Sequence, residues 1–366
     1  MLGFCCVSDS TRNERDAGHW ECVLERVIWP ATANCVHLDL LFVGGVAMAT
    51  RNGSRRFRNL DGSAAPGTVL PAFRMLVLDS LAGRGRGVPR KAPVPCVETD
   101  LVAIASPPGP GEGARLTWIG HASWLVQLEG KSFLIDPIFG DLALGPGGRN
   151  VPAGVLPENL PPIDAVLITH NHYDHLDLPS VQQVGAPVIA GLGMQAFLAK
   201  KGIPASELNW WESAELGSAK VSFVPAQHYS RRGLTDANET LWGGFVVEGP
   251  SASIYHSGDT GYFDGFREIG RRFPAIDAAL LPIGAYDPAW FMRAQHMNPE
   301  EAVQAYLDLG ARSFFAMHWG TFKLTYEPLD EPPVRLAAEW KRLGLTASEK
   351  RVLAVGETAE VRRPNE

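Results

Sequence analysis

Side chains that commonly bind metal ions are concentrated in one short segment, at His170, His172, Asp174 and His175. The segment follows residues 165–169 (AVLIT), which are expected to form a buried strand. Alternate side chains of an extended segment point the same way, so His170 and His172 can face one ion. Asp174 and His175 come after the chain turns and can reach a second ion. Burial of these groups without a metal would leave polar atoms unsatisfied, so the sequence predicts a metal site.

Three more residues of the same type come shortly after apolar stretches. They are His228, Asp259 and His318. Each alone is a weak candidate, but polar side chains at the ends of strands are where sites on sheet scaffolds gather. The seven residues together predict a site for two metal ions. No cysteine lies near them, so the expected ligands are nitrogen and oxygen atoms.

Two other histidines in this half of the chain have different surroundings. His256 lies inside an expected strand, which favours a structural role. His296 lies just before the helix expected at Pro299–Leu309, for which Asn298 is the expected N-cap. Because His296 does not follow a strand, it is expected to contact the substrate or support the ligands rather than bind a metal.

The composition narrows the class of protein. Of 366 residues, 45% are hydrophobic and 20% are charged, which is typical of a globular chain. The net charge is −7, whereas nucleic-acid-binding proteins usually carry an excess of basic residues, so no nucleic-acid partner is expected. The cysteines number five and lie in the first hundred residues, which favours a cytoplasmic protein without disulfides. No apolar run approaches the roughly 18–20 residues that span a bilayer.

Three zones are expected along the chain. Residues 1–65 are expected to be an irregular tail, or in part not native protein, because Met48 opens a second plausible start. Residues 66–114 are expected to hold one helix, at 70–82, and a linker rich in proline and glycine that packs on the main domain. The 70–82 helix is amphipathic and can cover the main domain or touch a membrane. Residues 115–366 are expected to form the main domain.

The main domain is expected to combine strands and helices. The expected strands are 116–119, 124–128, 133–135, 165–169, 221–224, 244–247, 253–255, 278–281 and 313–317. The expected helices are 194–201, 263–273, 299–309 and 333–343. This mixture predicts an α/β fold with helices outside the sheets, and it leaves open a sandwich or a single sheet.

The order H-x-H-x-D-H, followed by His, Asp and His, resembles the ligand order of the metallo-β-lactamase superfamily. That resemblance implies a metallo-β-lactamase-like αββα sandwich with two Zn²⁺ per chain, for which other divalent metals can substitute. Several segments resemble, more closely, the phospholipases D that hydrolyse N-acyl-phosphatidylethanolamine. They are 117–123 (TWIGHAS), 136–139 (DPIF), 160–168 (LPPIDAVLI), 258–262 (GDTGY), 282–286 (PIGAY), 290–292 (WFM), 295–296 (QH) and 318–322 (HWGTF).

The resemblance also implies a division of roles. One zinc ion would be bound by His170, His172 and His228. The other would be bound by Asp174, His175 and His318, and Asp259 would bridge the two ions. Proton transfer would fall to Asp174 or Asp259, with His296 beside them as a further catalytic residue. The side chains expected to contact the substrate are those of Gln295, His296, Tyr286 and Trp290.

The implied reaction is hydrolysis of N-acylphosphatidylethanolamine to N-acylethanolamine and phosphatidic acid. Two alternatives stay open: a metal-dependent hydrolase of a sugar-phosphate lactone or a soluble phosphodiester, and a metal-binding protein without enzymatic activity. The expected partners are the phospholipid or other phosphodiester substrate, a membrane surface touched peripherally, and a second copy in a homodimer. The expected location is the cytoplasm, with or without peripheral membrane association.

Overall fold

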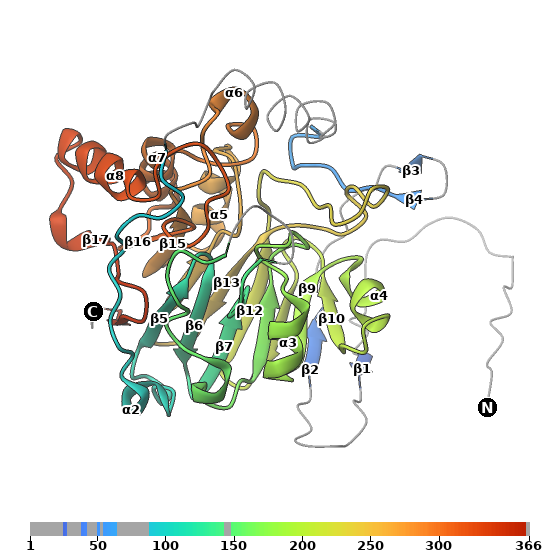
Figure 1. The fold of residues 1–366 in the computed structure, drawn as a ribbon. Helices are drawn as coiled ribbons and strands as arrows, with labels where there is room; N and C mark the ends of the chain where they lie inside the picture. The colour runs from blue at the N-terminus through green and yellow to red at the C-terminus, as the bar shows by residue number, and fades with distance from the viewer. Residues whose placement is uncertain are drawn as a thin grey trace, which may run out of the picture.

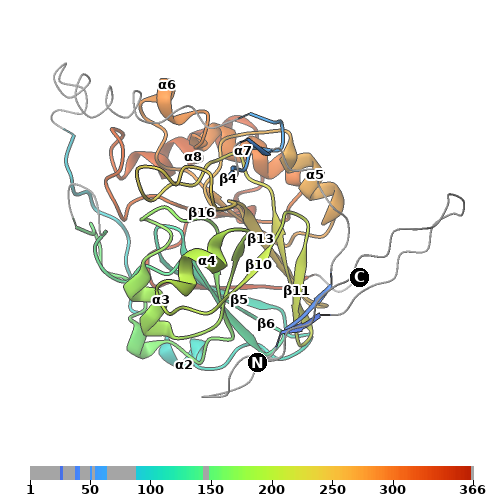
Figure 2. The same ribbon diagram turned by 90° about the vertical axis from the view of Figure 1, so that its right-hand side faces the viewer.

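The fold consists of two β-sheets packed face to face, with helices over their outer faces (Figure 1; Figure 2). The structure is a computed structural model, and it describes residues 25–27, 38–41, 50–51, 54–63, 88–142 and 148–363. This is the αββα arrangement that the family resemblance implied, and the α/β fold class is confirmed.

The first sheet contains seven strands in the order β10-β9-β8-β7-β6-β5-β18. Their bounds are β5 Ala114–Gly120, β6 Ser123–Leu128, β7 Lys131–Ile135, β8 Ala165–Ile168, β9 Val188–Gly191, β10 Ala205–Leu208 and β18 Thr358–Val361. Strands β18, β5, β6 and β7 pair antiparallel, whereas β7 to β10 pair parallel. Strand β8 is buried along its whole length, which explains its uninterrupted apolar sequence.

The second sheet contains nine described strands in the order β1-β2-β11-β12-β13-β14-β15-β16-β17. Their bounds are β1 Glu25–Val27, β2 Leu38–Leu41, β11 Ser213–Leu216, β12 Ala219–Val224, β13 Gly244–Glu248, β14 Ser253–His256, β15 Ala278–Pro282, β16 Phe314–Met317 and β17 Lys350–Arg351. Strands β14 to β17 pair parallel. A separate hairpin joins β3 (Thr50–Arg51) to β4 (Ser54–Arg55). Strands β1 to β4 all lie inside the segment expected to be irregular.

Helices cover both outer faces of the sandwich. The described helices are α2 Leu101–Ile104, α3 Leu178–Val184, α4 Met194–Ala199, α5 Gly265–Arg272, α6 Ala289–Met292, α7 Pro299–Leu309 and α8 Glu331–Arg342, with 3-10 turns η2 Pro157–Asn159 and η3 Ala347–Glu349. Helices α3 and α4 lie against the seven-stranded sheet, and α5, α7 and α8 lie on the side of the nine-stranded sheet (Figure 1; Figure 2). Asn298 caps α7 as expected, because its side chain accepts from the Glu301 N–H in a capping box.

Aromatic side chains from both sheets fill the space between them. Trp118 of β5 stacks near Trp124 of β6 and near Trp319, with ring centroids 6.2 Å and 5.6 Å away. Trp124 also meets Phe315 of β16 edge to face at 6.2 Å. Trp118 and Trp124 have no exposed surface, and such rings contribute much of the apolar area that holds two sheets together.

The sandwich brings the carboxyl ends of several parallel strands to one edge. Asp136 follows β7, His170 follows β8, Asp259 follows β14 and His318 follows β16. Asp136 and His318 have positive φ values of 44° and 59°, so the chain turns sharply where these strands end. Ligand-type side chains from four separate strands therefore meet at the same edge.

The elements that sequence patterns did not predict are short or polar. They are α2, α3, α6, β9, β10, β11, β17 and β18. Helix α3 carries Pro179 and two glutamines, and β10 (ASEL) and β11 (SAEL) each contain two small residues, one glutamate and one leucine. Their conformation comes from pairing and packing rather than from local periodicity. The helix expected at 70–82 and the start at Met48 lie outside the described residues.

We predict that Trp124→Ala lowers the free energy of unfolding by about 3–5 kcal/mol, because it removes a ring enclosed between both sheets. Urea denaturation followed by circular dichroism measures the change. Val334→Ala on α8 is the control, since Val334 is 68% exposed and its loss should cost less than about 0.5 kcal/mol. Equal effects of the two substitutions would contradict the packing described above.

Candidate metal centre

Three imidazoles converge where β8 and β12 end. His170 and His172 lie in the loop after β8, and His228 lies in the loop after β12. The distance from His170 Nε2 to His172 Nδ1 is 2.9 Å, and that from His228 Nε2 to His172 Nδ1 is 3.2 Å. Together with a carboxylate oxygen of Asp259, these nitrogens lie within 4.8 Å of one another. The group can therefore surround one ion.

A second group forms beside the first, from Asp174, His175 and His318. The Nε2 atoms of His175 and His318 lie 3.7 Å and 3.5 Å from Asp174 Oδ2. A fourth residue, His121, joins them, with its Nε2 atom 3.1 Å from the same oxygen. These four side chains also have ligand atoms within 4.8 Å of one another, so they can surround a second ion.

Asp259 lies between the two groups. Its Oδ1 atom is 3.0 Å from His318 Nε2, and its Oδ2 atom is 3.2 Å from His175 Nε2. The same Oδ2 atom is 3.9 Å from His228 Nε2 and 4.0 Å from His170 Nε2. This is the position that a carboxylate bridging two ions requires.

The donor atoms fit divalent zinc. His175 Nε2, His318 Nε2 and Asp259 Oδ1 are buried and have no hydrogen-bond partner among the described residues, which is costly unless a cation satisfies them. His228 Nδ1 donates to the Gln295 carbonyl at 2.8 Å, so His228 Nε2 is unprotonated and its lone pair faces the site. Imidazole nitrogen and carboxylate oxygen are ordinary zinc ligands.

The buried carboxylate of Asp136 orients histidines of both groups. His175 Nδ1 donates to Asp136 Oδ2 at 2.7 Å, and the Thr169 hydroxyl donates to the same oxygen at 2.6 Å. Because the Thr169 hydroxyl proton is used there, its oxygen accepts from His170 Nδ1 at 3.0 Å. In the neutral form of each imidazole, the Nε2 atoms of His170 and His175 would then keep a lone pair for a metal.

Arg232 fixes the loop that carries four of the expected ligands. Its guanidinium donates to the carbonyl oxygens of Asn171 and Leu176 at 3.0 Å and 2.8 Å. It also lies over the Tyr173 ring, 4.0 Å from the centroid. Arg232 therefore holds the loop and adds positive charge beside the site.

Burial and mutual contact set the charges of the first group. Burial, reinforced by His228, lowers the pKa of His172 to about 3. Burial also lowers the pKa of His228 to about 4 and that of His170 well below its ordinary value. These imidazoles are neutral at pH 7, which is the form that binds a metal.

The buried carboxylate of Asp259 and the histidines of the second group shift one another's pKa values. Burial alone would raise the pKa of Asp259, but His175 and His318 outweigh it and hold that pKa well below its ordinary range. Burial would lower the pKa of His318, yet Asp259 raises it to about 9. A bound cation would stabilise the Asp259 carboxylate in place of protonated His318, and the His318 imidazole would then lose its proton.

Residues 131–319, more than half of the chain, match the β-lactamase superfamily domain. The chain belongs to the metallo-β-lactamase superfamily. It is accordingly a metal-dependent hydrolase, in agreement with the enzyme class expected from the sequence.

Two relatives and one solved structure illustrate the range of this superfamily. The chain is 39% identical over 246 residues to the N-acyl-phosphatidylethanolamine-hydrolyzing phospholipase D 1 of Caenorhabditis elegans, covering 61% of this chain and 69% of that one. It is 32% identical over 230 residues to a UPF0173 metal-dependent hydrolase of Pyrobaculum arsenaticum, covering 61% and 92%. The metallo hydrolase Igni18 of Ignicoccus hospitalis superposes with a TM-score of 0.54 at 25% identity, covering 67% and 97%.

The residues expected to contact the substrate do not share one environment. Gln295 is 2% exposed, and its backbone carbonyl oxygen accepts a hydrogen bond from His228 Nδ1. His296 Nδ1 lies 3.7 Å from Asp259 Oδ2, and both His296 and Tyr286 line a cavity beside the metal centre. Trp290 lies on α6, 42% exposed and 5.6 Å from the Phe291 ring. Its role as a wall of the cleft stays a prediction.

His256 has the structural role that its place in a strand suggested. Its Nε2 atom donates to the Ala122 carbonyl at 2.9 Å, which links the two sheets. Its Nδ1 atom accepts from the Gly258 N–H at 3.1 Å. Both ring nitrogens are therefore occupied, and no lone pair is left for a metal.

Sequence reasoning missed His121 and Asp136 as parts of the centre. His121 follows β5, is 2% exposed, and packs its ring 3.9 Å from that of His318. Asp136 follows β7 and has no exposed surface. Both lie in segments singled out for their family resemblance and both follow a strand, which is the signal that identified the other ligands.

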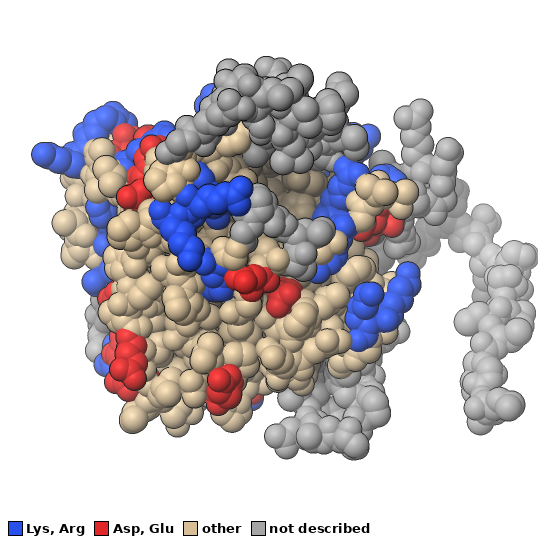
Figure 3. All heavy atoms as spheres, viewed as in Figure 1, with Lys and Arg blue, Asp and Glu red and all other residues tan. Residues whose placement is uncertain are grey.

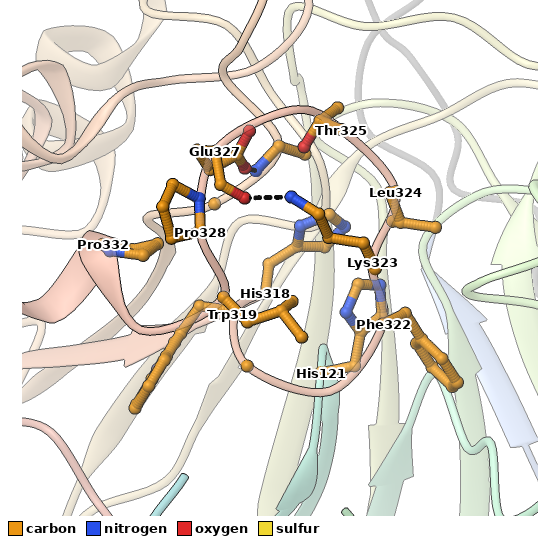
Figure 4. A pocket seen from close by; sticks show the side chains of 14 residues that line it. His121, His318, Trp319, Phe322, Lys323, Leu324, Thr325, Glu327, Pro328 and Pro332 are labelled. Atoms are coloured by element: carbon orange, nitrogen blue, oxygen red, sulfur yellow. Dashed lines mark hydrogen bonds between the residues drawn. The ribbon is translucent and has the colours of Figure 1, made fainter. Parts of the chain in front are cut away.

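A small cavity of about 10 Å³ lies beside the second group, and Lys323 is among the residues that line it. Figure 4 shows this side chain extending past the rings of His318 and His121, toward the carbonyl oxygen of Glu327, to which its ammonium donates. Burial lowers the pKa of Lys323. The cavity is about the size that one water molecule requires.

We predict that Asp136→Asn weakens zinc binding by roughly 10–100-fold, because it removes the charged acceptor that orients His175 and, through Thr169, His170. Zinc retained per chain after dialysis against graded chelator measures the effect. Asp164→Asn is the matched control, since the Asp164 carboxylate accepts from the Lys131 ammonium away from the centre. Equal zinc retention by the two variants would contradict the orienting role of Asp136.

Proposed function

We propose that the chain is a two-zinc phosphodiesterase. The observation that carries the proposal is the placement of Asp259 between two groups of ligand atoms. His170, His172 and His228 would bind one ion, and Asp174, His175 and His318 the other. Zinc ions held in this way supply a nucleophile at neutral pH and neutralise charge that develops on phosphoryl oxygens.

The cations around the centre suit an anionic substrate. Arg232 and Lys323 lie beside the ligand loops, although the chain as a whole has a net charge of −7. On the face drawn in Figure 3, most of the visible Lys and Arg side chains lie in the upper half, where the loops after the strands lie in Figure 1. Local positive charge of this kind attracts phosphate esters.

The residues of the chain would orient the ester and move protons. Asp174 and Asp259 are ionised at neutral pH and can accept a proton. The contact of 3.1 Å between Asp174 Oδ2 and His121 Nε2 offers a path for that proton. Neutral His296, beside Asp259, can donate a hydrogen bond to the ester oxygen that departs.

The first candidate substrate is N-acylphosphatidylethanolamine, cleaved to N-acylethanolamine and phosphatidic acid. The relative from Caenorhabditis elegans carries that activity in its name. No described helix is long and apolar enough to cross a membrane. We propose that the chain reaches the lipid by peripheral contact with a membrane. We also propose that the chain can form a homodimer.

The second candidate is a soluble phosphodiester or a sugar-phosphate lactone. It is favoured by the charged lining of the cavity beside His296, which is ill suited to hydrocarbon. The UPF0173 relative supports no more than metal-dependent hydrolysis and is compatible with either candidate.

We predict that the zinc-loaded chain releases N-acylethanolamine from mixed micelles containing N-acylphosphatidylethanolamine, and that it also cleaves bis-p-nitrophenyl phosphate. His170→Ala should lower both rates by at least about 100-fold, because it removes a ligand from the nucleophile-generating site. Mass spectrometry of the lipid products and absorbance of nitrophenolate measure the two reactions. Chelation should abolish both, and added zinc should restore them.

The pattern of rates separates the candidates. Cleavage of bis-p-nitrophenyl phosphate without release of N-acylethanolamine would reject the lipid and keep the phosphodiesterase. Cleavage of a lactone alone would reject the lipid and the phosphodiesterase, and it would leave the lactone of the second candidate. Absence of any activity above that of His170→Ala, in a chain shown by metal analysis to hold zinc, would overturn the proposed function and favour a non-enzymatic metal-binding protein.

A further inference from the structure

A cavity of about 330 Å³ lies next to the metal centre, and its lining is charged. It is formed by the residues around α6, the start of α7 and the loop that leads into α8. The charged residues that line it are Asp287, Arg293, Glu301, Glu327, Glu331 and Arg335. Its volume falls in the ordinary range for small-molecule sites.

His296 connects this cavity to the metal centre. It lines the cavity, is 7% exposed, and its Nδ1 atom has no hydrogen-bond partner among the described residues. Its ring lies 5.1 Å from that of His228 and 5.7 Å from that of His318. A phosphodiester whose phosphate lies at the metal centre could therefore extend one of its ester groups past His296 into the cavity.

The cationic side chains of the cavity wall are already paired. Arg335 donates to both carboxylate oxygens of Glu300, at 3.1 Å and 2.6 Å, and lies over the Tyr286 ring at 4.5 Å. Arg293 donates to Glu301 at 2.7 Å. These guanidinium groups are committed to the wall, so they offer little to a ligand.

Two of the four carboxylates of the wall, those of Asp287 and Glu331, have fewer partners than those of Glu301 and Glu327, which accept from backbone N–H groups. Asp287 makes no side-chain hydrogen bond or ion pair with any described residue. The Tyr286 hydroxyl and Arg335 both approach the same atom of Glu331, Oε1, at 2.7 Å and 3.7 Å. An ionised carboxylate only accepts hydrogen bonds. The cavity therefore offers acceptors and negative charge in excess of donors.

We propose that this cavity binds the alcohol portion of the substrate and selects a short alcohol that carries a hydrogen-bond donor at its far end. An ammonium group would bind best, because it adds charge complementarity to three donors, and an amide N–H or a hydroxyl would bind less tightly. An alkyl group would cover the Asp287 carboxylate without offering it a hydrogen-bond partner. The inference rests on the proposed phosphodiesterase function and names the part of the substrate that this site recognises.

Calorimetry with four phosphate monoesters tests the proposal on the zinc-loaded full chain. Phosphoethanolamine, its N-acetyl form and 2-hydroxyethyl phosphate end in a donor, whereas propyl phosphate has nearly the same size and ends in a methyl group. We expect phosphoethanolamine to bind roughly tenfold or more tighter than propyl phosphate, in line with one charge-assisted hydrogen bond. The two neutral donors should fall between them. Equal or tighter binding of propyl phosphate would overturn the proposal.

Variants locate the effect in the cavity. Asp287→Asn should lower the ratio of propyl phosphate Kd to phosphoethanolamine Kd by several-fold, and Glu331→Gln provides a second test if the first variant folds poorly. Glu268→Gln, on the exposed face of α5, is the matched control and should leave the ratio unchanged. An unchanged ratio in both cavity variants would contradict the assignment. This experiment measures binding and not hydrolysis. A chain that hydrolyses no substrate would therefore reject the proposed function, whereas the ratio of Kd values would still decide whether the cavity selects a donor-bearing alcohol.

Discussion

The mutual compensation of buried charged and polar groups is the constraint on which the rest of the site depends. Seven histidines and several carboxylates lie at one edge of the sandwich, most of them with almost no exposed surface. An isolated charge in such a place would be prohibitively costly, so each group must have a partner. Asp136 illustrates the solution, because one carboxylate accepts from His175 and from Thr169 and thereby orients ligands in both groups.

The fold meets this constraint by ending several strands at the same edge. The backbone turns sharply at Asp136 and His318, and also at His121, where φ is 54°. Such conformations cost about 1–3 kcal/mol each and persist only where the surrounding structure enforces them. Here the surrounding structure is the aromatic core between the sheets, formed around Trp118 and Trp124. Stability of the core and geometry of the metal centre are therefore linked.

Segments far from the ligand motif in sequence complete the centre. The Asn59 side chain accepts from the backbone N–H of His228 at 3.0 Å and from the Trp242 indole at 3.0 Å. Arg232 reaches back to the ligand loop after β8. Asn59 therefore helps to fix the position of His228, and Arg232 helps to fix the loop after β8.

Chemistry and selectivity are divided between different parts of the chain. The strand ends provide the candidate ligands, whereas the loops around α6 and before α8 provide the cavity beside His296. The superfamily uses one scaffold for several hydrolytic reactions, and such division lets the loops vary while the ligands stay in place. The charged lining of the cavity is therefore the feature of this chain that bears most directly on its substrate.

Much of the fold could be predicted from sequence, because local patterns carried the information. Strands such as β8 and β16 are continuous apolar runs, and α7 has a helix cap and amphipathic spacing. The short strands β10 and β11 and helix α3 escaped prediction, since their residues have weak intrinsic preferences and adopt their conformation through neighbouring elements.

The sequence by itself determined the chemical character of the centre, because the density of imidazole and carboxylate groups around His170 admits few uses other than metal binding. It also indicated the ligands at strand ends. Only the tertiary structure decided which of these groups lie close enough together to surround an ion, that Asp259 lies between the two groups, and that Asp136 and His121 contact them. The physical reason is that ligand groups are defined by distances of a few ångströms, and the packing of two sheets sets those distances between residues far apart in the chain.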